Sequence, residues 1–236
     1  MAANDPSTAA ASESTRSLTD ADRSGPGGLS ELAYVQLRER LVTLQIPPGA
    51  PLEEDVLMAQ LRLGRTPVRE AIKRLSLENL VAVYPRRGTF ATHVDVTDLA
   101  LISDVRAPLE GHAALRAAQR LTAADRAELG RLRRTLTSRR QERARGTPME
   151  LKLDGEVHRF VYRCARNSYL AEILERYYAL SLRLWYLVLD RLPPLPARVD
   201  EHVELLDLLD RGDAAAARDR ADAHVRAFEQ GVRALL

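Results

Sequence analysis

The stretch from residue 64 to residue 75, which reads Gly-Arg-Thr-Pro-Val-Arg-Glu-Ala-Ile-Lys-Arg-Leu, places the strongest constraint on how this chain folds. Thr66 can cap a helix with its hydroxyl, and Pro67 suits the first helical position because a missing N–H costs nothing there. Apolar residues then recur at helical spacing and require a buried face: Val68, Ile72, Leu75 and Leu80. Cationic residues project elsewhere: Arg65, Arg69, Lys73 and Arg74. This combination is typical of a helix that enters the DNA major groove, although an ordinary amphipathic surface helix has the same pattern.

The flanking residues favour the DNA-binding alternative. Residues 52–61 predict a short preceding helix, and the segment from Arg62 to Gly64 predicts a tight turn that contains a glycine. Downstream, residues 80–84 and 89–92 have strand-like composition and are joined by Pro85-Arg86-Arg87-Gly88. The sequence therefore predicts a helix-turn-helix followed by a basic β-hairpin wing.

Four ordered segments resemble the winged-helix domain of GntR-type bacterial transcription regulators: Ile46-Pro47-Pro48-Gly49, Leu52-x-Glu54, Arg65 to Ala71 and Pro85 to Phe90. The resemblance implies DNA contacts from the recognition helix and the wing, to which neighbouring cations add phosphate contacts. The expected DNA-binding residues are Arg65, Thr66, Arg69, Lys73, Arg86, Arg87 and Gly88. The chain departs from the family pattern at two places, which alters the expected half-site contacts. Arg62-Leu63-Gly64 replaces the usual Gly-Val-Ser, and Asp55 replaces a basic residue that is common on the preceding helix.

Composition sets further bounds on the class of protein. The 236 residues are 45% hydrophobic, which suits one large domain or two modest domains with real cores. A net charge of +2 is small for a protein that wraps nucleic acid, but a dimeric operator binder needs only local positive patches. The single cysteine, Cys164, excludes an internal disulfide, which favours a reducing compartment and a small buried residue at that position.

The first 28 residues are rich in small and polar types, and we expect residues 1–28 to form a disordered tail. The sequence shows no basic segment followed by an apolar one, as a signal peptide would. It also shows no apolar stretch long enough to span a bilayer. We therefore expect a cytoplasmic protein with no membrane partner.

We divide the rest into a winged helix-turn-helix domain over residues 29–93, a linker over 94–98 and a helical effector and dimerisation domain over 99–236. In the helical domain, six segments show apolar residues with a 3.6-residue period: 99–118, 123–143, 149–166, 169–191, 197–211 and 214–235. The short breaks between these segments favour an antiparallel bundle. The predicted fold is mostly α, with an N-terminal winged helix-turn-helix and a C-terminal all-α antiparallel bundle.

The second of these segments is heavily loaded with arginine: Arg126, Arg131, Arg133, Arg134, Arg139, Arg140 and Arg143. A second nucleic-acid surface is conceivable at this segment. Aromatic residues do not interleave with the cations, as they do in surfaces that stack bases. We therefore favour the interpretation that this is a solvated, charge-rich helix face.

Asp154 and His158 stand four residues apart on one predicted helix, so both side chains leave the same face about one turn apart. His202 and His224 lie on two later predicted helices, from which they can converge on this pair. One carboxylate and three imidazoles would suit Zn, Mn, Ni or Fe(II). By spacing alone, a satisfied polar pair or a surface contact is the simpler interpretation of Asp154 and His158.

The helical part also resembles the six-helix FCD-type effector domain of the FadR subclass of GntR regulators. The residues that carry this resemblance are Asp154-x-x-x-His158, Asn167, Glu201-His202, Asp210 and His224. It implies a divalent metal ion with a small carboxylate effector beside it, and the metal ligands would be Asp154, His158, His202 and His224. It also points to Arg106, four residues before Glu110, as the effector anchor and to Asn167 as an effector contact. A structural Arg106–Glu110 pair is the alternative.

Together these features predict a homodimeric, ligand-responsive transcription regulator. We expect it to bind double-stranded operator DNA as a repressor and not to act as an enzyme. An effector that binds one dimer arrangement better would change the spacing of the two recognition helices, which must match half-sites one helical turn apart. Two alternatives stay open: a metal-dependent enzyme fused to a DNA-binding module, and a pure metal sensor. Four aromatic residues on one predicted helix can line a pocket or belong to the core or the dimer interface: Tyr177, Tyr178, Trp185 and Tyr186.

Overall fold

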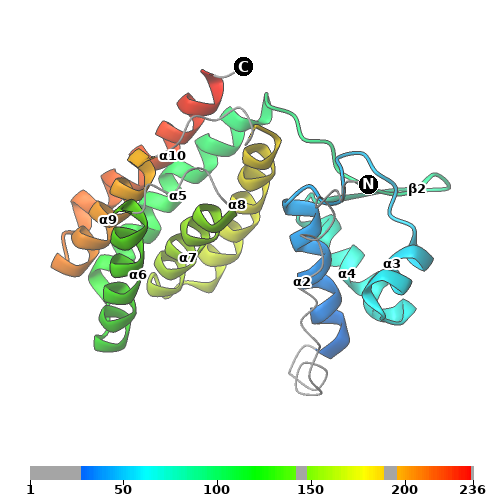
Figure 1. Ribbon diagram of the computed structural model, residues 1–236, viewed down its shortest axis with the longest axis horizontal. Helices are drawn as coiled ribbons and strands as arrows, with labels where there is room; N and C mark the ends of the chain where they lie inside the picture. Colours follow the sequence, from blue (N-terminus) through cyan, green and yellow to red (C-terminus); the bar gives the residue numbers. More distant parts are fainter. Residues whose placement is uncertain (1–27, 142–147, 189–195, 235–236) are drawn as a thin grey trace, which may run out of the picture.

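The computed structural model describes residues 28–141, 148–188 and 196–234, which form two lobes (Figure 1). The smaller lobe contains α2 (Gly28–Val42), α3 (Glu54–Leu61), α4 (Arg65–Leu77), β1 (Val81–Tyr84) and β2 (Gly88–Ala91). The larger lobe contains α5 (Asp98–Arg120), α6 (Ala123–Gln141), α7 (Pro148–Cys164), α8 (Ser168–Val188), α9 (Pro196–Arg211) and α10 (Ala214–Arg233). The predicted fold class is therefore confirmed. Residues 1–27 of the expected tail lie outside the described residues, and Gly28 is the first residue of α2.

The helix-turn-helix forms where the sequence predicts it, but its turn differs in detail. Gly64 is the N-cap of α4, with extended backbone and no side-chain cap, so the prediction that Thr66 caps this helix is wrong. Pro67 is the third rather than the first residue of α4, and it still lies in the first turn, where its missing N–H removes no helical bond. The left-handed residue of the turn is Arg62, with φ of 55°, and its backbone N–H donates to the Met58 carbonyl.

The apolar rear of α4 builds the core of the smaller lobe. Val68, Ala71 and Leu75 are fully buried and pack with side chains from α2 and α3. The neighbours from these two helices are Leu37, Leu41, Leu57 and Leu61. The cationic front of α4 is consequently left at the surface.

The wing is the antiparallel hairpin of β1 and β2, in which Val81 pairs with Ala91 and Tyr84 pairs with Gly88. Its turn places Pro85 before Arg86, which has a positive φ of 62°. Gly88 has φ of 106°, a conformation that residues with a Cβ rarely adopt, so a glycine is required at the tip. An isolated bridge from Pro51 to Phe90 ties the wing to the segment before α3.

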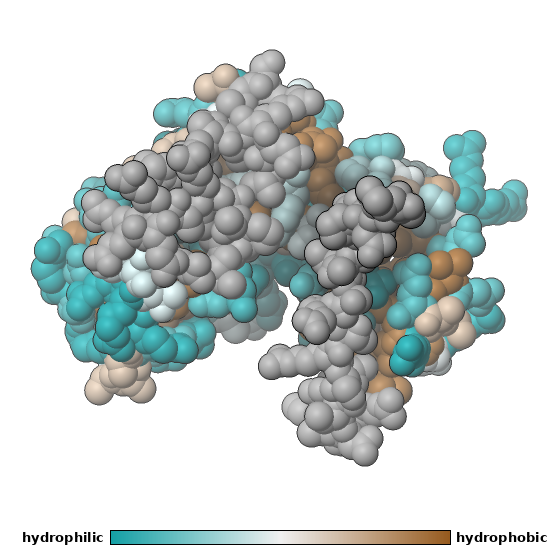
Figure 2. All heavy atoms as spheres, viewed as in Figure 1, coloured by the Kyte–Doolittle hydropathy of each residue, from teal (hydrophilic) through white to brown (hydrophobic). Residues whose placement is uncertain are grey.

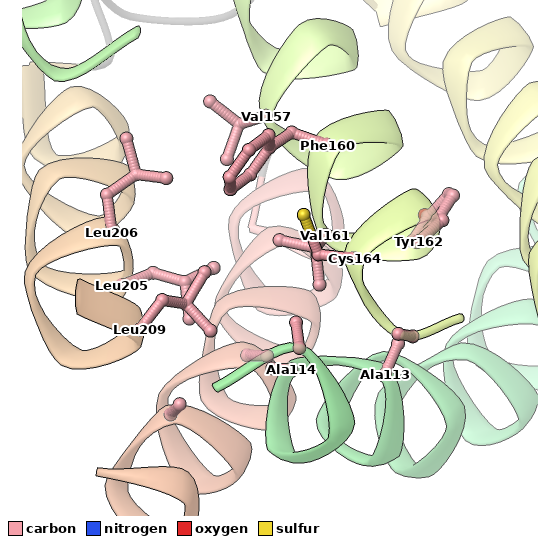
Figure 3. Packing of buried hydrophobic residues seen from close by; sticks show 14 of the residues in the cluster. Ala113, Ala114, Val157, Phe160, Val161, Tyr162, Cys164, Leu205, Leu206 and Leu209 are labelled. Carbon is pink, nitrogen blue, oxygen red and sulfur yellow. The ribbon is translucent and has the colours of Figure 1, made fainter. Parts of the chain in front are cut away.

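All six helices of the larger lobe contribute to its core, and Figure 3 shows the part where α5, α7 and α9 meet. Val157 and Phe160 of α7 face Leu206 of α9, and the thiol of Cys164 lies among the same side chains. Cys164 is completely buried, as predicted for a small apolar position. Small residues such as Ala113 and Ala114 on α5 allow the helices to approach closely.

Three of the arginines on the arginine-rich helix α6 form ion pairs. Arg126 Nη1 lies 2.7 Å from Asp210 Oδ1, and Arg133 Nη1 lies 2.8 Å from Asp207 Oδ1, both on α9. Arg131 pairs with Glu128 on its own helix. These contacts agree with the solvated-face interpretation. The side chains of Arg139, Arg140 and Arg143 lie outside the described residues.

Hydrophilic residues cover the outer end of the larger lobe and the tip of the wing, whereas hydrophobic residues show near the junction of the two lobes and on the smaller lobe below the wing (Figure 2). Part of this junction is made by α8, whose Ala179 is buried in the core of the smaller lobe. Among the described helices, none combines the length and the apolar composition that are needed to cross a bilayer.

Candidate functional site

The structure brings together the four side chains that the sequence predicts as metal ligands. Asp154 and His158 extend from adjacent turns of α7, His202 from α9 and His224 from α10, and all four are buried. One ligand atom from each lies within 4.8 Å of the other three. The Nε2 atoms of His158, His202 and His224 lie 3.7, 3.5 and 4.0 Å from the Asp154 carboxylate. Donors that share one ion at about 2.1 Å lie roughly 3 to 4 Å apart, so this arrangement can hold a metal ion.

Two carboxylates orient the imidazole rings from behind. His158 Nδ1 lies 3.2 Å from Glu110 Oε2, and His224 Nδ1 lies 2.6 Å from Glu201 Oε2. A ring that donates its Nδ1–H to a carboxylate presents an unprotonated Nε2 on its opposite edge. These Nε2 atoms are the ones that face Asp154. The contacts therefore prepare His158 and His224 for metal coordination.

Two tyrosines complete the polar network around the cluster. The Tyr178 hydroxyl donates to Asp154 Oδ2 at 2.7 Å, and the Tyr162 hydroxyl donates to Glu110. Burial raises the pKa of both phenols well above the ordinary value, and the neighbouring carboxylates raise it further. Both hydroxyls consequently stay protonated and act as donors that fix the carboxylates.

Arg106 forms the structural pair that one interpretation predicts, and its position also allows the other. Its Nη2 lies 2.7 Å from Glu110 Oε1, which is the predicted pair at i, i+4. It also lines a cavity beside Asp154 and His158, and its Nε–H has no hydrogen-bond acceptor among the described residues. Burial alone would raise the pKa of the Glu110 carboxyl, but His158 and Arg106 together lower it to about 2. Glu110 is therefore anionic. The helix α5 continues through Pro108, so Arg106 and Glu110 lie on the same helix.

The cavity beside the cluster is small. Its volume of about 10 Å³ has room for about one water molecule. Ser181, Trp185 and Phe228 contribute to its walls, and the rings of Trp185 and Phe228 stack with centroids 5.2 Å apart. Of the aromatic group predicted as pocket lining or core, Tyr178 and Trp185 line the cavity, whereas Tyr177 and Tyr186 pack against an apolar cluster.

Asn167 does not reach this cavity. Its side chain is exposed, and its Oδ1 accepts the Leu170 N–H at 3.2 Å at the start of α8. Tyr178, which does line the cavity, lies about 16 Å further along the same helix. The structure thus gives Asn167 a helix-capping contact in place of the effector contact that the resemblance implies.

The predicted DNA-binding residues form an exposed face on α4 and the wing: Arg65, Thr66, Arg69, Lys73, Arg86, Arg87 and Gly88. Two of these cations have acidic partners on α3. Arg69 Nε lies 2.8 and 2.9 Å from the two carboxylate oxygens of Glu54, and Arg65 Nη2 lies 3.0 Å from Asp55 Oδ1. Both guanidinium groups lie near the N-terminus of α4, where base edges are read in helix-turn-helix complexes, and each is paired with a carboxylate there.

Comparison with known families agrees with this geometry. Residues 29–91 match the model of bacterial regulatory proteins of the gntR family, and residues 101–227 match the FCD domain. The chain belongs to the GntR family and carries an FCD domain. This membership confirms the resemblance to GntR-type regulators and identifies the helical lobe as an FCD domain.

Relatives of this GntR-family chain include the HTH-type transcriptional repressor RspR of Escherichia coli, 24% identical over 206 residues, which covers 87% of this chain and 89% of RspR. A probable D-xylose utilization operon transcriptional repressor of Paenarthrobacter nicotinovorans is 28% identical over 199 residues, which covers 78% of this chain and 80% of that protein. Among solved structures, E. coli McbR/YncC has the same fold, with a TM-score of 0.76 and 24% identity. The match covers 88% of this chain and 98% of the McbR/YncC chain. The chain is thus a DNA-binding transcription regulator.

The sequence predicts only part of this FCD-domain site. It indicates Glu110 only as a partner of Arg106, although Glu110 also accepts from His158 and Tyr162. It indicates Glu201 only as a neighbour of His202, although Glu201 orients His224. The spacing of Glu110 and Arg106 was a usable signal, but the contacts across helices depend on which faces meet.

Proposed function

We propose that this GntR-family protein is a ligand-responsive repressor of the FadR subclass that acts as a homodimer and binds a divalent metal ion in its FCD domain. The single observation that carries the proposal is the buried cluster of one carboxylate and three imidazoles, with ligand atoms within 4.8 Å of one another. Such a donor set suits Zn, Mn, Ni or Fe(II) and contains no thiolate that would select zinc. The metal ligands are Asp154, His158, His202 and His224.

A small carboxylate effector is proposed to bind beside the metal. One carboxylate oxygen would approach the metal ion, and Arg106 would bind the other through the Nε–H that lacks an acceptor among the described residues. Because the cavity holds only about one water molecule, the effector must displace side chains from its wall. The stacked pair of Trp185 and Phe228 is the apolar part of that wall. Binding would therefore favour one arrangement of the helices over another, which is the requirement for regulation.

The DNA-binding part of the proposal rests on α4 and the wing. Arg65, Arg69 and Lys73 are exposed on the face of α4 that its buried side leaves free. Arg86 and Arg87 are exposed at the tip of the wing. In a homodimer, two recognition helices would contact half-sites of a palindromic operator about one helical turn apart.

The size of the cavity favours a second candidate, a pure metal sensor in which the ion alone changes operator affinity. An ion held by the four ligands needs no room in this cavity, whereas an organic acid does not fit a space of about 10 Å³ without movement of the wall. The two candidates differ in one observable property. In a metal sensor, operator affinity changes with the ion and does not respond to any carboxylate.

Fluorescence anisotropy on the DNA upstream of the gene tests the proposal. Arg69→Ala should weaken binding by about 1–3 kcal/mol and reduce its salt dependence, because a cation at the groove is lost. Arg211→Ala, which removes an exposed arginine from the far end of α9, is the matched control and should bind like the wild type. Failure of the wild type to bind this DNA or any site found by genome-wide selection would refute the regulator proposal.

The same assay then separates the two candidates. Protein treated with a chelator, protein reloaded with Mn²⁺ or Zn²⁺, and reloaded protein with a panel of small carboxylates are compared on the same operator. A carboxylate that releases the operator from wild type but not from Arg106→Met supports the effector site. A response to the ion alone, with no response to the panel, supports the metal sensor.

A further inference from the structure

Helix α8 contacts the cluster of Asp154, His158, His202 and His224, here called the metal cluster, with one side. With another side it contacts the smaller lobe, here called the DNA-binding lobe because it carries α4 and the wing. On the first side, Tyr178 donates to Asp154, and Ser181 and Trp185 line the cavity. On the second side, Ala179 is buried in the core of the smaller lobe. Figure 1 shows α8 as the bundle helix that runs beside α2. Any displacement of α8 therefore reaches both lobes.

Glu175 on α8 joins two other helices through its two carboxylate oxygens. Oε1 lies 3.2 Å from Arg159 Nε, and Arg159 directly follows the ligand candidate His158 on α7. Oε2 lies 3.9 Å from Arg38 Nη2 on α2, and the same Nη2 donates to the backbone carbonyl of Glu175 at 3.0 Å. One side chain thus links the helix that carries Asp154 and His158 to the DNA-binding lobe.

Arg38 continues this series of contacts to the recognition helix. Its Nε donates to Glu78 Oε2 at 2.9 Å, and Glu78 is the C-cap residue of α4. Tyr34 on α2 also donates its hydroxyl to Glu78. The side chains of Arg38 and Glu78 are only 18% and 20% exposed, so solvent screens this pair less than a surface pair. An unbroken series of charged contacts runs from α7 through Glu175 and Arg38 to the end of α4.

A second contact between α8 and the DNA-binding lobe lies two turns further along the helix. Arg183 is 2% exposed and donates to both the carbonyl and the hydroxyl of Thr92, which follows β2. The Thr92 hydroxyl in turn donates to the Asn79 carbonyl, just after α4. Both series of contacts therefore lead from α8 to the C-terminal end of α4, at Glu78 and Asn79.

We propose that Glu175 and Arg38 are positioning residues that couple occupancy of the metal cluster to the placement of the recognition helix. This inference rests on the proposed function, because it takes the cluster to bind a metal ion. An ion held by Asp154 and His158 restrains the turn of α7 that also carries Arg159, and Glu175 passes that restraint to Arg38. Neither Glu175 nor Arg38 is a metal ligand candidate or a residue of the DNA-binding face. By linkage, metal affinity and operator affinity then change each other by the same factor.

Hydrogen–deuterium exchange on the full-length protein tests this coupling without the need for an operator. Glu175→Gln removes the charge and keeps the size, and Glu172→Gln, one turn earlier on the exposed side of α8, is the matched control. Adding Mn²⁺ to chelator-treated protein should slow exchange in α7 for all three proteins. It should slow exchange at residues 75–80, the end of α4, in wild type and Glu172→Gln only. Equal slowing at residues 75–80 in Glu175→Gln, or none in wild type, would overturn the coupling.

Operator affinity provides a readout that a merely structural defect would not change. The quantity is the ratio of the operator Kd with Mn²⁺ to that with chelator. Glu175→Gln should shift this ratio toward one by about 2- to 30-fold, the range seen for residues that modulate coupling. The Arg38→Met and Glu175→Gln double variant should lose no more coupling than either single variant. A general loss of folding would weaken binding equally in both conditions, leave the ratio unchanged and contradict the proposal.

The two proposals fail in different ways. If Mn²⁺ neither binds nor protects α7 in the wild type, the metal-binding function itself is wrong, and the coupling proposal falls with it. If Mn²⁺ protects α7 but residues 75–80 and operator affinity do not respond, only the coupling role of Glu175 and Arg38 is wrong.

Discussion

At the scale of single residues, the chemistry of the FCD domain depends on which nitrogen of each histidine faces the cluster. Glu110 and Glu201 contact the Nδ1 atoms of His158 and His224, and this leaves their Nε2 atoms near Asp154. The ring orientation is therefore set before any ion binds. Prepared ligands lose little conformational freedom on coordination, which favours tight metal binding.

His202→Ala should abolish tight metal binding, because it removes one of the four side chains that can coordinate the ion. We expect metal affinity to fall by about 100-fold or more. The measurement is competition with a chromogenic chelator, together with metal content after dialysis. His112→Ala removes an exposed histidine from α5 and should keep wild-type metal content. Equal metal content in the two variants would show that the cluster is not the metal site.

Asp55→Asn should tighten DNA binding. Asp55 is 82% exposed and its pair with Arg65 adds little to stability, but its charge faces the same surface that approaches DNA. Removing it frees Arg65 for a phosphate, so we expect about 2- to 10-fold tighter binding and a salt slope steeper by about one. Asp219→Asn breaks a comparable exposed pair with Arg218 on α10 and should leave anisotropy titrations unchanged. Unaltered or weaker binding by Asp55→Asn would mean that this carboxylate positions Arg65 for its contact.

At the scale of secondary-structure elements, close helix approach decides where a side chain is tolerated. A Cβ added at Gly111 on α5 would lie 3.1 Å from both the backbone oxygen and the Cγ of Arg218 on α10. A Cβ added at Gly130 on α6 would find its nearest neighbour, Arg134 Nη1, at 3.5 Å. The two glycines have the same helical preference but different neighbours, so tertiary contacts separate them.

Gly111→Ala should destabilise the protein by about 1–3 kcal/mol, because a backbone carbonyl of α10 has to move. Gly130→Ala should stabilise it by up to about 1 kcal/mol, because alanine favours a helix interior and nothing has to move. Urea denaturation midpoints measure both effects. If both substitutions raised the midpoint alike, α5 and α10 would be further apart than the structure places them.

At the scale of the whole molecule, the cluster joins α7 to α9 and α10, which follow α7 in the chain only after the whole of α8. An ion that binds only the folded arrangement stabilises it by mass action. At a free metal concentration of about 1,000 times Kd, the gain is about 4 kcal/mol. A bound metal ion would therefore act on the fold as well as on the site.

Removing metal with a chelator should lower the melting temperature of the wild type, and Mn²⁺ or Zn²⁺ should restore it. Mg²⁺ should not, because it prefers oxygen ligands and binds imidazole poorly. Differential scanning calorimetry measures the shift, and His202→Ala should melt at one temperature in all of these conditions. A wild-type melting temperature that ignores chelator and metal would rule out tight binding at the cluster.

Much of the architecture was predictable from sequence, because its signals are local. The 3.6-residue period located the helices from α5 to α10, and the basic turn after Tyr84 located the wing. The spacing of Asp154 and His158 on one helix determined that both leave the same face. These features depend on near neighbours along the chain, so the order of residues is sufficient to determine them.

Only the tertiary structure decided which of these faces meet. It made Glu110 on α5 the acceptor of His158 on α7. It also set the small cavity beside Arg106 and placed Glu175 between α7 and α2. Each of these outcomes depends on the packing of helices far apart in sequence, where small differences in approach decide whether a polar group finds a partner.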